Sequence, residues 1–296
     1  MNIGAGRIVW QSLSRINNSI KTGEFNQNEA IVEAINRAKN NNKKFHIFGL
    51  CSDGGVHSHT SHIIAIAKLA HKLGLEKVYY HAFLDGRDVA PKSAGIYLKK
   101  IVEEGHVTVA TVGGRYYGMD RDKNYDRIQV AYDAMTIAKG EYFADPFAGI
   151  EASYAKGVTD EFMVPFVSAK DGMVEDGDSI VFANFRPDRA IQISTCLSNP
   201  EGIVYNAEKP YRMDLSHAPK NVFYVSMMKY TTNISTYYEQ ADVLLVCSRS
   251  ETLSKVDIEA QKMGLPVIAT DIEANKEQIQ DNYNGILYKR GNVNDL

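Results

Sequence analysis

Short apolar runs alternate along most of the chain with segments in which apolar residues recur at helical spacing. The run from Val78 to Leu84 is apolar and aromatic, and it has the length of a buried strand. Comparable runs occupy residues 44–50, 107–112, 179–184 and 221–227. Segments with helical spacing lie between them at residues 28–40, 61–73, 93–104 and 125–138, the first with an asparagine cap. This alternation predicts an α/β fold in which helices cover a mixed or parallel sheet.

The pattern changes character near residue 235. Apolar runs at 241–246, 266–270 and 284–288 predict three more short strands, and residues 251–263 and 273–280 predict helices between them. The sequence therefore predicts a second, partial Rossmann-like unit.

Charged side chains follow four of the predicted strands at the point where each strand ends. These residues are His57, Arg87, Asp88, Arg115, Arg121, Arg186 and Arg189. The carboxyl ends of parallel strands meet at one edge of a sheet, which is where ligands of open α/β folds bind. We therefore expect these side chains to lie close together around one ligand.

The arginines among them indicate the chemistry of that ligand. Two guanidinium groups in close contact repel each other by about 4 kcal/mol at an effective dielectric constant of roughly 20, so a cluster needs an anion or nearby carboxylates. Arginine forms forked bonds to phosphate and carboxylate. Pro187 also predicts a helix N-terminus, with Arg186 as its cap, which would add positive charge. The pattern predicts a small ligand with a phosphate, with or without a carboxylate.

An alternative stays open at this point. Arginines in loops usually form surface or structural ion pairs, and Asp85, Asp120, Asp122 and Asp188 are available as partners. His57 and His59 stand two residues apart, but no pattern of carboxylate ligands accompanies them, so we predict no metal site there.

Composition argues against several classes of protein. The 296 residues carry a net charge of −3, which does not favour nucleic acid or a membrane surface as a partner. No apolar run approaches the roughly 20 residues of a transmembrane helix. The three cysteines are far apart and odd in number, which indicates a reducing compartment without a disulfide framework. We expect a cytoplasmic protein that binds neither nucleic acid nor membranes.

Several long and unusual motifs stand out along the chain. They are Asn2 to Arg7, Ser52 to His59, His81 to Ser93, Gly114 to Tyr117 with Met119 to Asp122, and Asn184 to Ala190. These segments closely resemble the cofactor-independent (2,3-bisphosphoglycerate-independent) phosphoglycerate mutases. The resemblance runs from residue 1 to about residue 232 in the order of the family.

The resemblance implies a function and a domain organisation. Those enzymes are cytoplasmic monomers of glycolysis that interconvert 3-phosphoglycerate and 2-phosphoglycerate through a phosphoserine intermediate and two manganese ions. They combine an alkaline-phosphatase-like domain with an inserted substrate-binding domain. By resemblance, residues 1–25 are a remnant of the phosphatase-like domain and residues 26–234 are the substrate-binding domain. The strand-end residues from His57 to Arg189 then match substrate contacts of the family.

The sequence also departs from the family pattern. The serine nucleophile of the family lies a few residues before the segment that matches Met1, and it is absent here, as are the Asp and His metal ligands. Ser52, Ser58 and Ser61 have no motif support as substitutes. We therefore expect a chain that is truncated at both ends relative to the family and inactive alone. We assign no catalytic residue and no manganese ligand to it.

Residues 236–296 are similar to the C-terminal nucleotide-sugar domain of glycosyltransferases built from two Rossmann-like domains. Glu251 and Glu259 stand eight residues apart. In the resembled family the second glutamate of such a pair contacts the ribose of the donor nucleotide. Both glutamates could instead lie on a solvated helix face. Two rival functions stay open: a non-catalytic phospho-metabolite binding module, and a glycosyltransferase fragment that uses a nucleotide-sugar donor.

Overall fold

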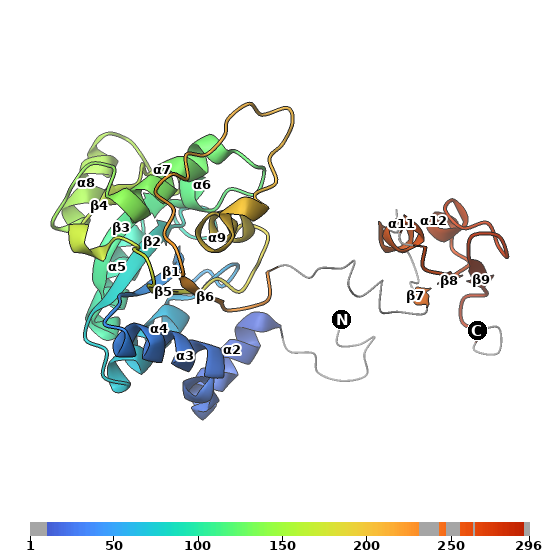
Figure 1. Cartoon of the computed structure of the whole chain (residues 1–296), viewed down its shortest axis with the longest axis horizontal. Coiled ribbons are helices and arrows are strands. Elements are labelled where there is room, and N and C mark those ends of the chain that lie inside the picture. The colour runs from blue at the N-terminus through green and yellow to red at the C-terminus, as the bar shows by residue number, and fades with distance from the viewer. Residues whose placement is uncertain (1–10, 231–242, 247–254, 263, 293–296) are drawn as a thin grey trace. The chain divides into compact units, whose positions relative to one another are not determined.

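Figure 1 shows the computed structural model of the chain, in which residues 11–230, 243–246, 255–262 and 264–292 are described. The described residues divide after Tyr230 into two compact units. Within these ranges no helix is both long and apolar enough to cross a lipid bilayer.

The first unit is built on a six-stranded sheet with the order β4-β3-β2-β1-β5-β6. Neighbouring strands are parallel except at the edge, where the short β4 runs antiparallel to β3. The strands are β1 (Phe45–Cys51), β2 (Val78–Leu84), β3 (Thr108–Gly114), β4 (Phe166–Val167), β5 (Ser179–Phe182) and β6 (Phe223–Ser226). The prediction of a mixed or parallel sheet is confirmed, and β4 lies in a stretch that showed no strand pattern.

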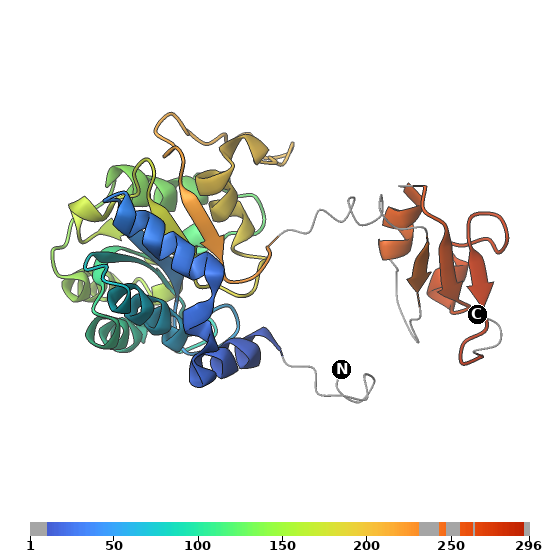
Figure 2. The ribbon, with the colours of Figure 1, turned by 60° about the horizontal axis from the view of Figure 1, so that its bottom comes forward.

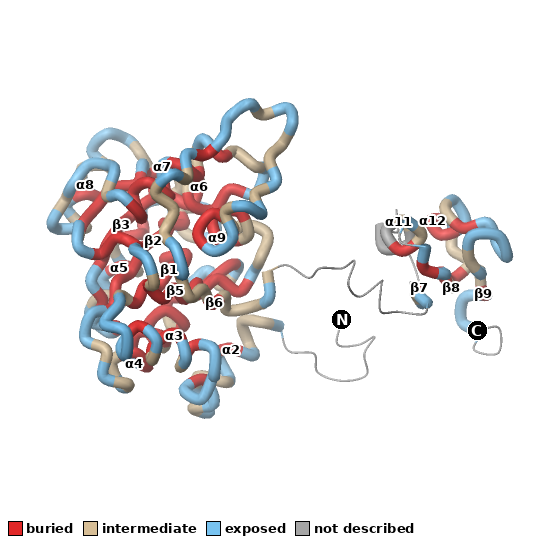
Figure 3. The backbone as a smooth tube through the Cα atoms, in the orientation of Figure 1, coloured by how far each residue is buried: buried red, intermediate tan, exposed pale blue. Residues whose placement is uncertain are grey.

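Helices cover both faces of this sheet, and the side chains of β1 show why. Phe45 and Ile47 pack into one apolar cluster, whereas Phe48 and Leu50 pack into another. Burying each such side chain contributes on the order of 2 kcal/mol. A strand that is apolar on both faces needs a covering layer on each side. In Figure 3 the strands β1, β2 and β5 are accordingly red, and exposed residues concentrate on the outer helices and loops.

The two helical layers differ in size. The first face is covered by α2 (Ser12–Thr22), α3 (Glu29–Asn40), α4 (Thr60–Lys72), α5 (Ala94–Gly105) and α8 (Pro146–Ala155), and the second by α7 (Tyr125–Ile137) and α9 (Ile191–Ser198). Short helical turns connect them: η1 (Glu24–Gln27), α6 (Arg115–Gly118), η2 (Asp160–Phe162), η3 (Lys170–Gly172) and η4 (Pro200–Gly202). In Figure 2, α3 is the long blue helix beside the orange strand β6, where Arg37 stacks 4.6 Å from the centre of the Phe223 ring.

Of two helix starts predicted from the sequence, the structure confirms one and contradicts the other. Asn28 Oδ1 accepts a hydrogen bond from the Ile31 N–H at 3.1 Å, so the asparagine cap of α3 is confirmed. The predicted helix start at Pro187 is wrong, because α9 begins at Ile191 and Pro187 instead opens a turn. Arg186 has no acceptor atom with which to cap free N–H groups, which explains the failure of that prediction.

A chain of buried polar side chains crosses the interior of the first sheet. His46 Nε2 lies 3.0 Å from Asp178 Oδ2, His46 Nδ1 lies 3.1 Å from His81 Nε2, and His81 Nδ1 lies 2.9 Å from Thr111 Oγ1. Because a carboxylate only accepts, His46 donates to Asp178, His81 donates to His46, and Thr111 donates to His81. Each imidazole is thereby held in one neutral tautomer. Burial lowers the pKa of both histidines, that of His81 well below its ordinary value of 6.5.

The second unit contains a three-stranded parallel sheet with the order β7-β8-β9. Its elements are β7 (Leu244–Val246), α11 (Lys255–Lys262), β8 (Val267–Thr270), α12 (Glu273–Lys276) and β9 (Ile286–Tyr288). A small apolar core includes Ala260 of α11 and Val267 and Ala269 of β8. The strands lie where the sequence predicted them, but α12 ends at Lys276 rather than at residue 280.

Candidate anion-binding site

The carboxyl ends of β1, β2, β3 and β5 lie at one edge of the first sheet, and the predicted residues follow them. Two contacts tie adjacent strand ends together. Asn184 Oδ1 accepts a hydrogen bond from the Leu50 N–H at 2.9 Å, and Ser52 Oγ donates to Asp85 at 2.6 Å. These residues are at most 1% exposed, so the base of the site is a buried polar framework.

Arg115 forms a buried ion pair at the centre of this framework. Its Nη1 lies 2.6 Å from Asp85 Oδ1 and 2.6 Å from Asp88 Oδ2, and its side chain is 3% exposed. Burial alone would raise the pKa of the Asp85 carboxyl, but the hydrogen bonds that it accepts outweigh burial and hold this pKa below its ordinary value. Arg115 Nε has no hydrogen-bond partner among the described residues, which leaves one buried donor unused.

Asp188 contacts three nitrogen-bearing side chains from three different loops. Its carboxylate accepts hydrogen bonds from Nε and Nη2 of Arg186, at 2.9 and 3.1 Å, and lies 3.4 Å from Arg121 Nη1. His57 Nδ1 lies 3.7 Å from it, too far for a hydrogen bond. The side chains of Arg121 and Arg186 are each 48% exposed, so this half of the site faces water.

Arg189 and Arg87 complete the arginine cluster, which consists of Arg87, Arg115, Arg121, Arg186 and Arg189. Arg189 Nη1 donates to the Met119 carbonyl at 3.2 Å. Burial lowers the pKa of the Arg189 guanidinium, and the positive charges of Arg115, Arg121 and Arg87 lower it further. Arg87 lies 3.3 Å from Glu161 Oε1 and is 55% exposed. Three other arginines of the cluster thus act on the charge of Arg189.

Glu161 reaches the site from η2, which packs tightly against the strand ends. A Cβ atom at Gly114 would lie 2.2 Å from the Glu161 carbonyl oxygen, so only glycine allows this approach. Asp160 holds η2 in place because its Oδ2 accepts hydrogen bonds from two amides at the start of α5, at 2.9 and 3.0 Å. This packing delivers the carboxylate that pairs with Arg87.

The charge balance of the site favours an anionic ligand. Burial lowers the pKa of His57 to about 4, and the charge of Arg115 acts in the same direction, so His57 is neutral near pH 7. Its Nδ1 has no hydrogen-bond partner among the described residues. The five arginines pair with or lie beside four carboxylates, which are Asp85, Asp88, Glu161 and Asp188. Among these nine groups, one positive charge remains in surplus.

The structure places all seven predicted residues at this edge of the sheet. Of the carboxylates considered as partners, Asp85 and Asp188 do pair with the arginines, whereas Asp120 lies 3.6 Å from Arg127. Sequence reasoning missed Glu161, because no periodic pattern marks its segment. It considered Asp85 only as an ion-pair partner, although Asp85 also accepts hydrogen bonds from Ser52 and from two backbone amides at the centre of the site.

Two other expectations concern the glutamates Glu251 and Glu259 and the manganese ions of the resembled family. Glu251 lies outside the described residues, and so does the side chain of Glu259 in α11, so their contact with a nucleotide sugar stays a prediction. In the described parts of the chain, no three His, Cys, Asp or Glu side chains are grouped as a metal site requires. These residues do not fit the manganese ions of the resembled family.

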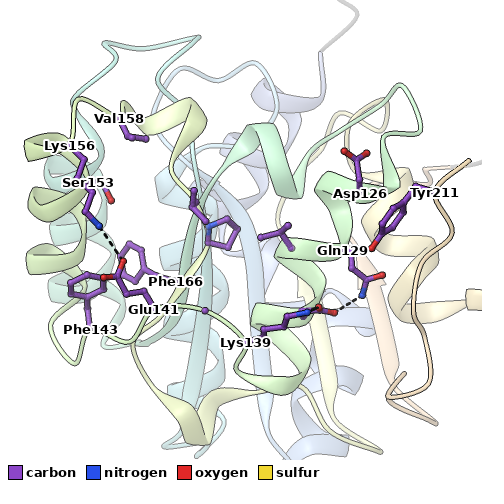
Figure 4. A pocket seen from close by; sticks show the side chains of 15 residues that line it. Asp126, Gln129, Lys139, Glu141, Phe143, Ser153, Lys156, Val158, Phe166 and Tyr211 are labelled. Carbon is purple, nitrogen blue, oxygen red and sulfur yellow. Dashed lines mark hydrogen bonds and ion pairs between the residues drawn. The ribbon is translucent and has the colours of Figure 1, made fainter. Parts of the chain in front are cut away.

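A separate cavity of about 440 Å³ is lined by none of the seven residues. Figure 4 shows its lining, with Gln129 of α7 on one side and Lys156 after α8 on the other. Both of its lysines are neutralised within the protein: Lys139 lies 2.8 Å from Asp133, and Lys156 lies 3.5 Å from Glu141. The arginine cluster therefore suits an anion better than this cavity does.

Comparison with known proteins shows the family of this chain. The family model described as the BPG-independent PGAM N-terminus matches residues 16–232. The chain belongs to this family. The 2,3-bisphosphoglycerate-independent phosphoglycerate mutase of Acholeplasma laidlawii is 49% identical over 237 residues, which cover 79% of this chain and 46% of that protein. The enzyme of the same name from Listeria monocytogenes is 46% identical over 241 residues, with the same coverage. The chain thus spans about half the length of these mutases.

The fold of this chain is also similar to that of a solved phosphoglycerate mutase structure. A phosphoglycerate mutase from Leishmania mexicana matches with a TM-score of 0.69 and 23% identity, covering 96% of this chain and 54% of that one. A second family model, glycosyl transferases group 1, matches residues 206–296. Residues 206–232 fall within both models, but β6 pairs with β5, so the structure assigns this strand to the mutase-like sheet.

Proposed function

We propose that the first unit binds a phosphorylated glycerate, such as 3-phosphoglycerate, at the arginine cluster. The observation that carries this proposal is the convergence of five guanidinium groups and the neutral His57 behind four parallel strand ends. Guanidinium groups form forked bonds to phosphate and carboxylate, and both groups are present in phosphoglycerate. The mutase relatives take their name from phosphoglycerate, which supports the same ligand.

Isothermal titration calorimetry with 3-phosphoglycerate tests this binding. Arg87 is half exposed and has one carboxylate partner, so Arg87→Ala should fold and lose most of the affinity. Arg15→Ala is the matched control, because Arg15 is an exposed arginine of α2 and lies outside the cluster. Equal affinity in both variants, or no binding by the unchanged chain, would contradict the proposal.

We further propose that this chain binds the ligand without converting it. A phosphoserine route needs an activated nucleophile and positive charge to stabilise the transferred group. Ser52 contacts the centre of the site, but it is 1% exposed and donates to Asp85, which Arg115 already engages. Purified chain supplied with manganese and 3-phosphoglycerate should therefore form no 2-phosphoglycerate above a protein-free control. Sustained turnover would overturn this.

The domain boundaries are part of the same proposal. We assign ligand binding to residues 26–234 and regard residues 1–25 and 235–296 as parts of other domains. Within the described residues, α2 is nevertheless joined to the binding unit, because Ile16 is buried in the same apolar cluster as Ile35. For residues 235–296, the glycosyltransferase likeness supports nucleotide-sugar binding as a second candidate function. If it is correct, Glu259→Ala should weaken binding of UDP-glucose to the full chain.

A further inference from the structure

The carboxylate of Asp188 is bound in the way that a phosphate would be. Arg186 contacts it through Nε and Nη2 at 2.9 and 3.1 Å, which is the forked geometry that arginine also uses with phosphate oxygens. Arg121 approaches the same carboxylate from another loop at 3.4 Å. Asp188 therefore occupies hydrogen-bond donors of Arg186 and Arg121 that the proposed ligand would use.

The pairs formed by Asp188 differ from the pair at the base of the site in how easily they can be broken. The side chain of Asp188 is 30% exposed and those of Arg121 and Arg186 are 48% exposed, whereas Asp85 and Arg115 are 1% and 3% exposed. Water-exposed ion pairs contribute at most about 1 kcal/mol, because solvent competes for both partners. The contacts of Asp188 can be exchanged for contacts with a ligand, while those of Asp85 cannot be broken without leaving a buried charge.

The positive charge of Arg189 favours a dianionic ligand over a monoanionic one in this exchange. No carboxylate lies within 4 Å of its guanidinium among the described residues, and its hydrogen bond goes to a backbone carbonyl. The charges of Arg115, Arg121 and Arg87 act on it as well, and the single negative charge of Asp188 opposes them. Asp188 forms no ion pair with Arg189 among the described residues. A phosphate dianion brings a second charge and a third terminal oxygen.

We propose that Asp188 is a built-in competitor for the phosphate group: it holds Arg186 and Arg121 in the free protein and releases them when a dianionic ligand binds. Asp188 is thus a specificity-determining residue, because a monoanion gains little by displacing another monoanion. The identity of the ligand rests on the proposed function, but the exchange itself requires only a dianionic phosphate. Asp188 acts through the arginines and needs no contact with the ligand.

The sign of one affinity change tests this inference. Asp188→Asn keeps the shape of the side chain and removes its charge, so 3-phosphoglycerate and inorganic phosphate should each bind about fivefold more tightly, the effect of losing one exposed competing pair. Asp122→Asn is the matched control, since it removes the same charge one residue from Arg121, and Asp122 is exposed. Asp188→Glu should restore the affinity of the unchanged chain. Calorimetry at one fixed, low ionic strength measures all four proteins.

Each result of this titration decides something. Unchanged or weaker phosphate binding by Asp188→Asn, relative to Asp122→Asn, would show that Asp188 positions the arginines rather than competing for them, and would overturn the inference. Binding of phosphate but not of 3-phosphoglycerate would reject the proposed function and leave the exchange standing. Binding of neither probe by the unchanged chain would reject both.

A measurement on the unchanged chain covers the case in which Asp188→Asn does not fold. With ¹⁵N-labelled arginine, the Nε signal of Arg186, assigned from the spectrum of Arg186→Lys, reports its bond to Asp188 Oδ1. Saturating inorganic phosphate should shift this signal, while sodium acetate at the same ionic strength should not. A signal that stays in place with phosphate would overturn the inference.

Discussion

Two polar clusters are built on the same parallel sheet, and they differ in their access to water. The histidine chain, made of Asp178, His46, His81 and Thr111, is at most 4% exposed. In the arginine cluster, Arg87, Arg121 and Arg186 are each about half exposed, and only the pair between Arg115 and Asp85 is fully buried. The histidine chain is held by hydrogen bonds and the arginine cluster by ion pairs, and in both most partners lie far apart in the sequence.

This difference in exposure separates the polar contacts that stabilise the fold from those that are available to a ligand. A buried polar group that loses its partner costs about 1–3 kcal/mol or more, because water cannot replace the partner. An exposed pair loses little, because water takes over. The histidine chain and the Arg115 pair therefore belong to the framework, and the half-exposed arginines are free to change partners.

The largest effect is expected at the buried pair of the site. Asp85→Ala leaves the Arg115 guanidinium with Asp88 alone and removes the acceptor of Ser52, so the free energy of unfolding should fall by about 3 kcal/mol. Asp188→Ala, at the water-exposed end of the same cluster, should cost less than about 1 kcal/mol. Urea denaturation of both variants measures the difference. Similar losses would remove the distinction between framework and exchangeable contacts.

A smaller effect is expected from pH. The folded protein keeps His81 neutral, with its pKa well below 6.5, whereas the unfolded chain binds a proton near pH 6.5. Stability is thus fully present above pH 6.5 and is lost as the pH falls below it, by about 1.4 kcal/mol for this histidine at pH 5.5. Between pH 7.5 and pH 5.5 the free energy of unfolding should fall in both proteins. The fall should be about 1.4 kcal/mol smaller in His81→Gln than in the unchanged chain.

Histidines outside the buried chain contribute to the total pH dependence but not to this difference. Burial lowers the pKa of His57 and of His62 to about 4, and both remain in the His81→Gln variant. Urea denaturation at the two pH values gives the comparison. An unchanged pH dependence in the variant would mean that His81 is not held neutral by the buried chain.

The smallest effect is expected at the exposed rim of the arginine cluster. Glu161 pairs with Arg87 at 3.3 Å, and Arg87 is 55% exposed, so Glu161→Gln should change the free energy of unfolding by less than about 0.5 kcal/mol. Thermal and urea denaturation at low salt measure this change. A loss above about 2 kcal/mol would place this pair with the buried framework instead.

Most of the first unit could be predicted from local pattern. The apolar run at Val78–Leu84 is a strand with the predicted bounds, and the helical spacing before β1 corresponds to α3. The same reasoning failed at Pro187, where a residue preference was mistaken for a helix start, and in the segment that contains β4 and η2. Both of these elements are short and depend on packing against β3 rather than on periodicity of their own.

The order of strands and helices, and the arginines behind four strand ends, follow from local sequence pattern, because hydrophobic periodicity and turn residues act over a few positions. The pairing of the charged groups depends on the three-dimensional fold. Arg115 and Asp85 are 30 positions apart, and His46 and Asp178 are 132 apart. Which carboxylate meets which cation depends on how the parallel strands are ordered in the sheet and on how deeply each pair is buried, and neither property is encoded by any single segment.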